Sequence, residues 1–564
     1  MEACLFAAAG ERAADGRPWA RVLDALVALY APLGAAPGRA LLHEHAGGCA
    51  GWVALSDAAD AALRASWEAA GVVWWGEAPP PGLREAEAVL AASDAALRAL
   101  PGFGLLLACR GGATRLVTGP GGPVALYRAG DAFATHAVAC DRLARAAPAF
   151  EPRAVVDLAA LGYVGGDATL LRGVAAVAPA ARIDLRPAVR PDVASYWPAA
   201  ERWAPVPEPE AHAAAESALR RTLRARLHGV GAPRLGLTAG LDSMVVAIAL
   251  TDLGIPAGAF TWDHDPRDLA GARAAAARLG IAHDACPVAF TPAAERLAQL
   301  RTDVLWTEGM GVTAGLARPT WPAPMAAFVT GGGGEAGRAW LYRLQAGNHR
   351  RPSIAQLAGQ FRPDREIAAA DPEARAALSA RVRAWLEAAA GSGLTGWRLL
   401  DVLFVEQRLA RWGRGTLGRH AAPAVPAFLH PEVTAALVSA PLAERVADGF
   451  HRRLIARRLP GHPVAPPPTL QRRAVPPPLR RAAAALRARR PRPAAHAGGW
   501  AAPAPGDPYA EWLADAVLRA PLVTDALGER WAAATRDGLR RGDPAAAEGA
   551  LRVSAAVALQ EALR

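Results

Sequence analysis

Six consecutive residues combine small side chains, two hydroxyls and an acid in an order that suits phosphate binding. The run Thr238-Ala-Gly-Leu-Asp-Ser243 follows a β-like stretch that begins at Arg234, and a helix-like apolar stretch comes directly after it. Small residues let backbone N–H groups approach phosphates, and a helix N-terminus adds donors and about half a positive charge. Asp242 would repel phosphate unless it held Mg²⁺ that the phosphates also bind. The order predicts a Mg–nucleotide cradle made of Thr238, Ala239, Gly240, Leu241, Asp242 and Ser243.

An ordinary strand-to-helix turn, with Asp242 or Ser243 as helix cap, is the alternative for this stretch. The run is neither a GxxxxGK[ST] loop nor a GxGxxG fingerprint, so those two nucleotide-binding patterns do not apply. The choice between a cradle and a plain turn therefore depends on the rest of the chain.

Length and composition indicate a multidomain globular protein. The chain has 564 residues, of which 52% are apolar and 20% charged, so we expect two or three domains. No apolar run reaches the length of a transmembrane helix, and the N-terminus does not resemble a secretory signal. The five cysteines are scattered and form no CxxC or Cys/His cluster, which favours neither zinc nor disulfides and makes a reducing cytoplasm the expected location.

The cations of this chain are all arginine, because the sequence contains no lysine. The net charge of +11 is concentrated in residues 449–506, which hold 12 Arg and no Asp or Glu, so the rest of the chain is close to neutral. With no basic face interleaved with aromatic residues, we expect no nucleic-acid partner and no membrane partner. Any step that normally uses a lysine ammonium group must use arginine here.

Gly and Pro breaks and changes in the pattern of apolar residues divide the sequence into four predicted regions. Short apolar runs with Gly and Pro breaks predict a β-rich domain in residues 1–200, with helices at 56–71 and 83–100. A Pro-rich boundary begins at Tyr196, and from 206 to 460 strand-like runs near 234, 256, 281 and 326 alternate with helices at 212–228, 242–253, 268–279 and 292–302. This alternation predicts a parallel α/β sheet, and residues 373–460 are predicted to be mainly helical. A Pro/Arg-rich linker with a short helix at 479–490 is predicted at 461–506, and residues 507–564 are predicted to be helical.

Several motifs resemble those of class B asparagine synthetases and their relatives, the β-lactam synthetases and lasso-peptide macrolactam cyclases. LTAGLDSM resembles the pyrophosphate loop S-G-G-x-D-S of the ATP pyrophosphatases, and FVTGGGGEAGRAWLY resembles the second glycine-rich loop S-G-x-G-x-D-E. DLAGARAAAARLGIAH agrees with a family segment at Asp268, Ala272 and His283, and PAFLHPEVTAALVSAPLAERVADGFHRRLIARRLP resembles the region that contains the catalytic lysine. The resemblance spans roughly residues 105 to 460.

The resemblance implies an α/β protein with an Ntn-amidotransferase-like sandwich before an adenine-nucleotide α-hydrolase-like synthetase domain. It implies ATP and Mg²⁺ as cofactors, with Asp242 and Glu335 as metal ligands and Thr238, Gly240 and Ser243 around pyrophosphate. It also implies that the backbone around Thr261 contacts adenine, and that a glycine run passes close to the α-phosphate, namely Gly331, Gly332 and Gly333.

Five departures from the family pattern modify these expectations. The glutaminase of the family needs Cys as its mature N-terminal residue, but Glu2 stands here and Cys4 is internal, so we expect no glutamine hydrolysis. Met244 replaces a serine of the first loop and is expected to pack inward. In the second loop Glu335 takes the place of Asp and Ala336 that of Glu. Arg338 follows at i+3, where it would face phosphate or pair with Glu335.

The catalytic lysine of the family falls near Arg452 and Arg453, and we favour Arg453 because Arg457 then ends the L-L-R motif. Arginine binds phosphate through two donors and keeps its charge, but it does not titrate as a base. A solvated arginine run is the alternative. His430, where the family has Asp, has no assigned role, and His264 suits a solvated loop better than a catalytic site.

These features predict an ATP-dependent carbon–nitrogen ligase that adenylates a small-molecule or peptide carboxylate and transfers it to an amine. Glu406 and Tyr342 are candidates for the group that accepts the amine proton, against the alternatives of a surface acid and a core aromatic residue. Lasso-type peptide cyclisation and a degenerate, non-catalytic scaffold are the two competing interpretations. The sequence leaves the acid, the amine and the oligomeric state open.

Overall fold

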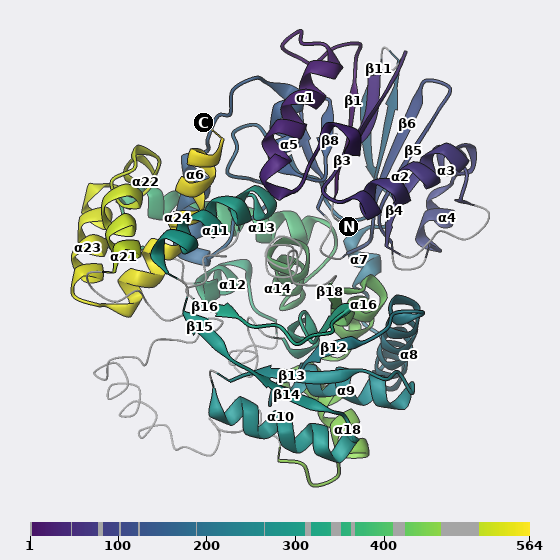
Figure 1. Ribbon diagram of the computed structural model, residues 1–564, viewed down its shortest axis with the longest axis vertical. Coiled ribbons are helices and arrows are strands. Elements are labelled where there is room, and N and C mark those ends of the chain that lie inside the picture. Colours follow the sequence, from purple (N-terminus) through teal and green to yellow (C-terminus); the bar gives the residue numbers. More distant parts are fainter. Residues whose placement is uncertain are drawn as a thin grey trace.

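The computed structural model describes residues 3–463 and 507–563, apart from 47, 77–82, 101–102, 122–124, 188, 264, 291, 311–316, 340–350, 362–366 and 410–423. Figure 1 shows a two-sheet unit at the top, a parallel sheet at the bottom and the C-terminal helices at the side. The predicted mixed α/β class, with a β-rich region first, a parallel sheet second and a helical end, is therefore confirmed. The linker prediction, with its helix at 479–490, lies almost entirely outside the described residues.

Two antiparallel sheets make up most of the first 195 residues. One has the strand order β2–β3–β1–β8–β7–β9 and the other β11–β10–β6–β5–β4. The strands of the first sheet are β1 (Ala3–Ala9), β2 (Ala40–His45), β3 (Gly48–Ala54), β7 (Tyr127–Ala129), β8 (Ala132–Ala134) and β9 (Ala175–Ala176). Those of the second are β4 (Val72–Gly76), β5 (Phe103–Arg110), β6 (Ala113–Thr118), β10 (Ala181–Arg186) and β11 (Val189–Ser195).

The alternation of side chains in β1 explains why the sheets stack. Leu5 and its alternate neighbours face a core shared with the second sheet, while Cys4 and Phe6 face the cluster that includes residues of α1 (Trp19–Tyr30) and α5 (Ala137–Ala144). Successive residues of a strand point to opposite faces, so one strand can serve both layers. The unit is thus a β sandwich with helices on its outside.

Two helix predictions for this unit have different outcomes. The helix predicted at 56–71 is confirmed as α2 (Asp57–Ala70). The helical prediction for 83–100 is confirmed in part, because the segment forms two short helices with a break between them, α3 (Ala86–Ala91) and α4 (Asp94–Arg98). Ser93 causes the break: its backbone is extended and its hydroxyl accepts a 3.3 Å bond from the Ala96 N–H, which starts a new helix.

The second sheet region is parallel and has the order β14–β13–β12–β17–β18. Four strands lie where alternation predicts them: β12 (Pro233–Gly236), β13 (Gly258–Trp262), β14 (His283–Cys286) and β17 (Ala327–Thr330). The fifth, β18 (Ala424–Pro426), lies in the region predicted to be mainly helical. Three residues are too few to show a period, so the sequence pattern does not reveal this strand.

Helices bury one face of the parallel sheet against a common core. They are α8 (Glu208–Leu227), α9 (Leu241–Asp252), α10 (Pro266–Leu279), α16 (Pro431–Ser439) and α18 (Gly449–Arg458). The three between residues 208 and 279 confirm the predicted helices there. The other face carries an aromatic cluster, in which Phe260 and Phe328 of the strands contact Trp262 and Trp321.

The C-terminal helices join the core of the molecule. They are α22 (Pro521–Leu527), α23 (Glu529–Arg540) and α24 (Pro544–Ala562), preceded by α21 (Pro508–Trp512), and they pack on α6 (Pro152–Leu161) and α11 (Ala293–Thr307). The predicted helical C-terminus is confirmed. Across the described ranges, the helices fall short of the length and apolarity that crossing a bilayer demands.

Candidate functional site

The two glycine-rich loops lie side by side at the carboxyl edge of the parallel sheet. Residues 237–240 connect β12 to α9, and residues 331–333 follow β17, the strand paired in parallel with β12. The chain runs from β12 to β13 and β14 on one side and places β17 and β18 on the other. The strand order therefore reverses between β12 and β17, which is where ligands bind in open α/β sheets.

The first loop is held by its two hydroxyl groups. The Thr238 N–H donates to Ser243 Oγ over 3.0 Å, and the Gly240 N–H donates to Thr238 Oγ1 over 3.0 Å. Thr238, Ala239 and Gly240 are exposed, whereas Leu241 is buried at the start of α9. Gly240 has no side chain to cap the helix, so the N-terminus of α9 meets the exposed loop without a side-chain cap, which is an arrangement that suits anion binding. Met244 is buried, as predicted.

The second loop fits against the first so closely that it needs glycine. A Cβ atom on Gly331 would lie 2.6 Å from the Ser243 nitrogen, and one on Gly334 would lie 2.4 Å from Asp242 Oδ1. Gly333 has a φ of 93°, in the left-handed region that glycine adopts readily. The Gly332 N–H donates to Thr330 Oγ1 over 3.1 Å. The predicted loop residues Gly331, Gly332 and Gly333 are thus brought to the predicted cradle.

Asp242 lies between two basic side chains. Its Oδ2 accepts a 3.0 Å bond from Arg338 Nη1, and its Oδ1 lies 2.9 Å from Nε2 of His451, although these two atoms are not aligned as in a good hydrogen bond. His451 belongs to α18 and is fully buried. Sequence reasoning missed this histidine, which the structure places directly on the central carboxylate.

The two acids of the site perturb one another. Burial would raise the pKa of Asp242, but His451 and Arg338 outweigh it and the pKa is lowered. The pKa of Glu335 is raised by burial and by the charge of Asp242. The Glu335 carboxylate also accepts a 3.0 Å bond from the Gly333 N–H. Two neighbouring carboxylates, each in the first turn of the helical segment that follows its loop, are oxygen ligands of the kind that Mg²⁺ prefers, so the residues fit the predicted ion.

Arg338 connects the site to α18 through a second acid. Its Nε donates to Asp448 Oδ1 over 3.0 Å, and Arg452 Nη2 lies 3.4 Å from Asp448 Oδ2. Desolvation would lower the pKa of Arg338, but Asp242 and Asp448 outweigh it and the pKa is raised. Asp448 is buried and has a φ of 58°, an uncommon conformation for a residue other than glycine. Arg338 thus pairs with Asp242 and Asp448, rather than with Glu335 as one alternative had it.

The structure does not bring Arg453 to Asp242. Its guanidinium pairs with Glu208, and with Glu444 Oε2 over 3.1 Å, on the exposed side of α18. Helical spacing explains the difference. His451 shares the buried face with residues three and four positions later, Leu454 and Ile455, whereas Arg453 does not. This spacing, applied to the sequence, is the signal that singles out His451.

Thr261 and the family-like segment support the first loop from β13 and α10. The Thr261 hydroxyl donates to the Leu237 carbonyl over 2.6 Å and lies 2.8 Å from His283 Nε2. The Ala239 N–H donates to Asp268 Oδ1 over 3.3 Å. The side chain of Thr261 is therefore engaged in holding the loop, and the predicted adenine contact of the backbone there stays a prediction.

Glu406, a candidate proton acceptor, is bound to the segment that follows the sandwich. On the π-helix η5 (Leu403–Leu409), its Oε1 accepts bonds from Arg202 Nη2 over 2.8 Å and Trp203 Nε1 over 3.0 Å. His430 is buried before α16. The other two candidates, Tyr342 and His264, lie outside the described residues.

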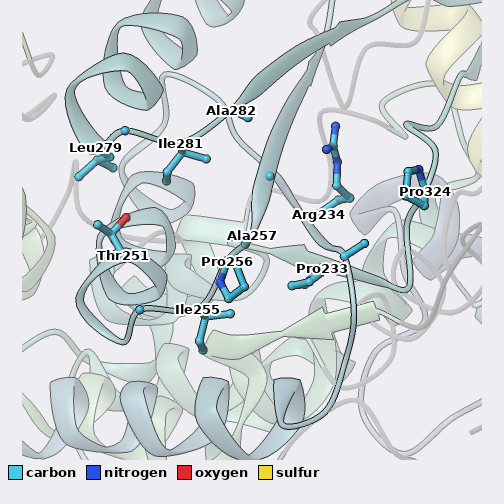
Figure 2. Close-up of a pocket in the computed structure, with 14 residues that line it drawn as sticks. Pro233, Arg234, Thr251, Ile255, Pro256, Ala257, Leu279, Ile281, Ala282 and Pro324 are labelled. Atoms are coloured by element: carbon cyan, nitrogen blue, oxygen red, sulfur yellow. The ribbon is translucent and has the colours of Figure 1, made fainter.

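A separate cavity of about 520 Å³ opens at the opposite edge of the parallel sheet. Figure 2 shows it lined by residues at the amino ends of the strands and in the turns before them, such as Pro233, Pro256 and Ala282. Arg234 beside it pairs with Asp284. Because the glycine-rich loops are at the carboxyl edge, this cavity belongs to a different part of the domain.

The candidate site therefore consists of two glycine-rich loops, a pair of acids and a buried histidine–arginine pair at the switch point of a parallel sheet. Comparisons of this chain with models of known protein families and with curated proteins found no match.

Proposed function

We propose that this chain is an ATP-dependent carbon–nitrogen ligase that resembles asparagine synthetase and does not hydrolyse glutamine. In this proposal the sandwich is an amidotransferase-like domain and the parallel-sheet unit is a nucleotide-binding synthetase domain. The substrates are a carboxylic acid, small or peptidic, and an amine.

One observation carries the proposal. The two glycine-rich loops pack against each other at the point where strand order reverses, and Gly331 and Gly334 allow contact with residues 242 and 243. A plain strand-to-helix turn would not call for a second loop of glycines at that place. A helix N-terminus without a side-chain cap, with two acids next to it, suits a nucleotide polyphosphate accompanied by a cation.

Each residue of the site has a role in the proposed reaction. Thr238, Gly240 and Ser243 would bind pyrophosphate in exchange for the hydrogen bonds that they make to one another, and Gly331 to Gly333 would pass along the α-phosphate. Mg²⁺ held by Asp242 and Glu335 would neutralise charge on the phosphates. Arg338 and Arg452 are the arginines that the ion pairs connect to the site, so they would stabilise the phosphate charge in place of Arg453.

The chemistry consists of two transfers. A carboxylate oxygen of the substrate attacks the α-phosphorus of ATP, a C(O)O–P bond forms, the bond between the α-phosphorus and its bridging oxygen breaks, and pyrophosphate leaves. The amine nitrogen then attacks the acyl carbon, the amide bond forms, AMP leaves with the bonding electron pair, and the amine gives up a proton. Activation is needed because AMP is a far better leaving group than hydroxide.

One feature of the described residues supports an amine that comes from a substrate rather than from glutamine. Cys4 is buried within β1, where its Sγ faces the Leu5 carbonyl at 3.9 Å. A buried thiol in the middle of a strand is not placed to attack glutamine. Glu406 is engaged with Arg202 and Trp203, so it links the two parts of the chain.

The test is exchange of labelled pyrophosphate into ATP, with Mg²⁺ and pools of carboxylic acids, for the wild-type chain and Asp242→Asn. We expect acid-dependent exchange in the wild type, and about a 100-fold loss in the variant because a charge that organises the phosphates is gone. Asp525→Asn is the matched control, since Asp525 is an exposed acid of α22. Exchange that survives in Asp242→Asn, or a wild-type chain that binds no ATP by calorimetry, would refute the proposal.

A further inference from the structure

The carboxylate that should hold the cation already has a partner at each oxygen. Oδ2 of Asp242 accepts the bond from Arg338 and Oδ1 lies beside His451. A divalent cation that bound Asp242 would have to replace one of these contacts. His451 is fully buried on α18, whereas Arg338 is 13% exposed at its side chain, so Arg338 has the greater freedom to move.

Arg338 is also anchored independently of Asp242. Its Nε donates to Asp448, which is buried at 1% exposure and fixed at the start of α18. A guanidinium group offers five donors in one plane. Within the part of the chain that the structure describes, Arg338 donates from Nε and Nη1, and no bond from Nη2 is present. The side chain therefore has donors to spare, beside loops whose backbone suits phosphate.

We propose that Arg338 is an exchangeable counter-ion of Asp242. It neutralises the carboxylate while the site holds no nucleotide, and it turns to the phosphates, still anchored by Asp448, when a divalent cation takes Asp242. This inference rests on the proposed function for the identity of the anion, but its first consequence concerns the cation alone.

The consequence is linkage between the cation and the nucleotide. A cation alone competes with Arg338 for Asp242 and binds weakly. A nucleotide that engages Arg338 removes the competitor, so each ligand favours the other by the same factor. Removal of the guanidinium should therefore strengthen cation binding, whereas loss of an ordinary structural ion pair would weaken or not affect it.

The test is Mn²⁺ binding to the full-length chain without nucleotide, followed by electron paramagnetic resonance. We expect Arg338→Gln to bind Mn²⁺ about tenfold more tightly than the wild type, in the usual range of coupling between sites. The added Asp242→Asn substitution should abolish the gain. Arg381→Gln is the matched control, because Arg381 also pairs with a buried acid, Asp157, on a different part of the molecule.

A second variant covers the case in which Arg338→Gln does not fold. Arg338→Lys keeps the charge and should bind Mn²⁺ as weakly as the wild type. Metal-free ATP, titrated in the presence of a chelator, should bind Arg338→Gln about tenfold more weakly than the wild type, because the phosphates lose a donor.

Equal Mn²⁺ affinity of the wild type and folded Arg338→Gln would overturn the counter-ion role, and so would a tight site in Arg338→Lys. Failure of the proposed function gives a different result from failure of the counter-ion role. If pyrophosphate exchange is absent but Mn²⁺ binding rises in Arg338→Gln, the counter-ion role holds and the ligase proposal fails.

Discussion

At the scale of single residues, Asp141 is an acid in a place that disfavours its charge. It lies in α5 with 1% exposure, and its Oδ1 is 2.8 Å from Arg145 Nε. Burial raises the pKa of Asp141 to about 6, and Arg145 and Arg142 offset only part of this rise. The folded chain therefore binds a proton here more tightly than the unfolded chain, whose value is near 3.8.

The sign of the resulting pH dependence follows from that order. A raised pKa stabilises the fold below pH 3.8, and this contribution is lost as the pH rises through about 6. The loss amounts to about 3 kcal/mol. We expect the wild-type unfolding free energy to fall by that amount more than that of Asp141→Asn over this window, measured with urea. Asp131→Asn, an exposed acid, should keep the wild-type slope, and equal slopes in all three chains would contradict the assignment.

The residues of the candidate site divide into those that sequence reasoning could find and those it could not. Asp242, Ser243 and the glycines are neighbours along the chain, so their order alone predicts a loop. His451 contacts Asp242 across more than 200 positions of sequence, and Asp448 contacts Arg338 across 110 positions. The arginines next to them in the sequence are more conspicuous because of their charge. The burial of His451 follows from helical spacing, but its contact with Asp242 depends on how α18 packs on α9.

At the scale of elements, the tight fit of the two loops gives a direct prediction. Gly334→Ala would place a Cβ atom 2.4 Å from Asp242 Oδ1 and 2.8 Å from its Cβ. Because the loops would have to separate, we expect the free energy of unfolding to fall by about 1–3 kcal/mol, the usual cost of overpacking. Urea titration measures it. Gly359→Ala is the control, since no atom of the described residues lies within 4 Å of its added Cβ on the exposed side of α12 (Ile354–Phe361), and it should leave stability unchanged or higher.

Elements with a strong period were predictable from sequence, and short ones were not. The strands and helices between residues 208 and 330 alternate, and each is long enough to show its own spacing of apolar residues. The parallel sheet was therefore predicted correctly. The fifth strand, β18, has three residues with proline at its end, and only its pairing with β17 makes it a strand. The order of strands is likewise a tertiary fact, although the family resemblance and the βα alternation both favour such a sheet.

At the scale of the whole molecule, the parts of the chain are joined by the helices that end it. Arg552 of α24 donates over 3.0 Å to the Ala159 carbonyl near the end of α6, and Arg142 donates over 3.1 Å to the Leu563 carbonyl. Arg296 of α11 donates to Asp507 over 2.7 Å. These bonds tie the last helices to the sandwich unit and to the parallel-sheet unit, so the C-terminal segment is an integral part of the fold.

This role predicts the effect of ending the chain at residue 506. Tyr509, Leu513, Val523 and Trp531 are buried at 3% exposure or less in the same apolar cluster as residues of α6 and α11. Without them that surface meets water, at a cost of roughly 1.5–3 kcal/mol for each large side chain that the cluster loses.

We therefore expect the chain of residues 1–506 to melt well below the full-length chain in calorimetry and to bind a hydrophobic dye that the full-length chain does not bind. Trp531→Ala should lower the melting temperature by less than the truncation does, because it reduces the free energy of unfolding by about 3–5 kcal/mol. Melting of the shortened chain at the full-length temperature, without dye binding, would mean that the sandwich and the parallel-sheet unit hold together through their own contacts. The bonds from Arg552 and Arg296 would then be consequences of the fold rather than causes of its stability.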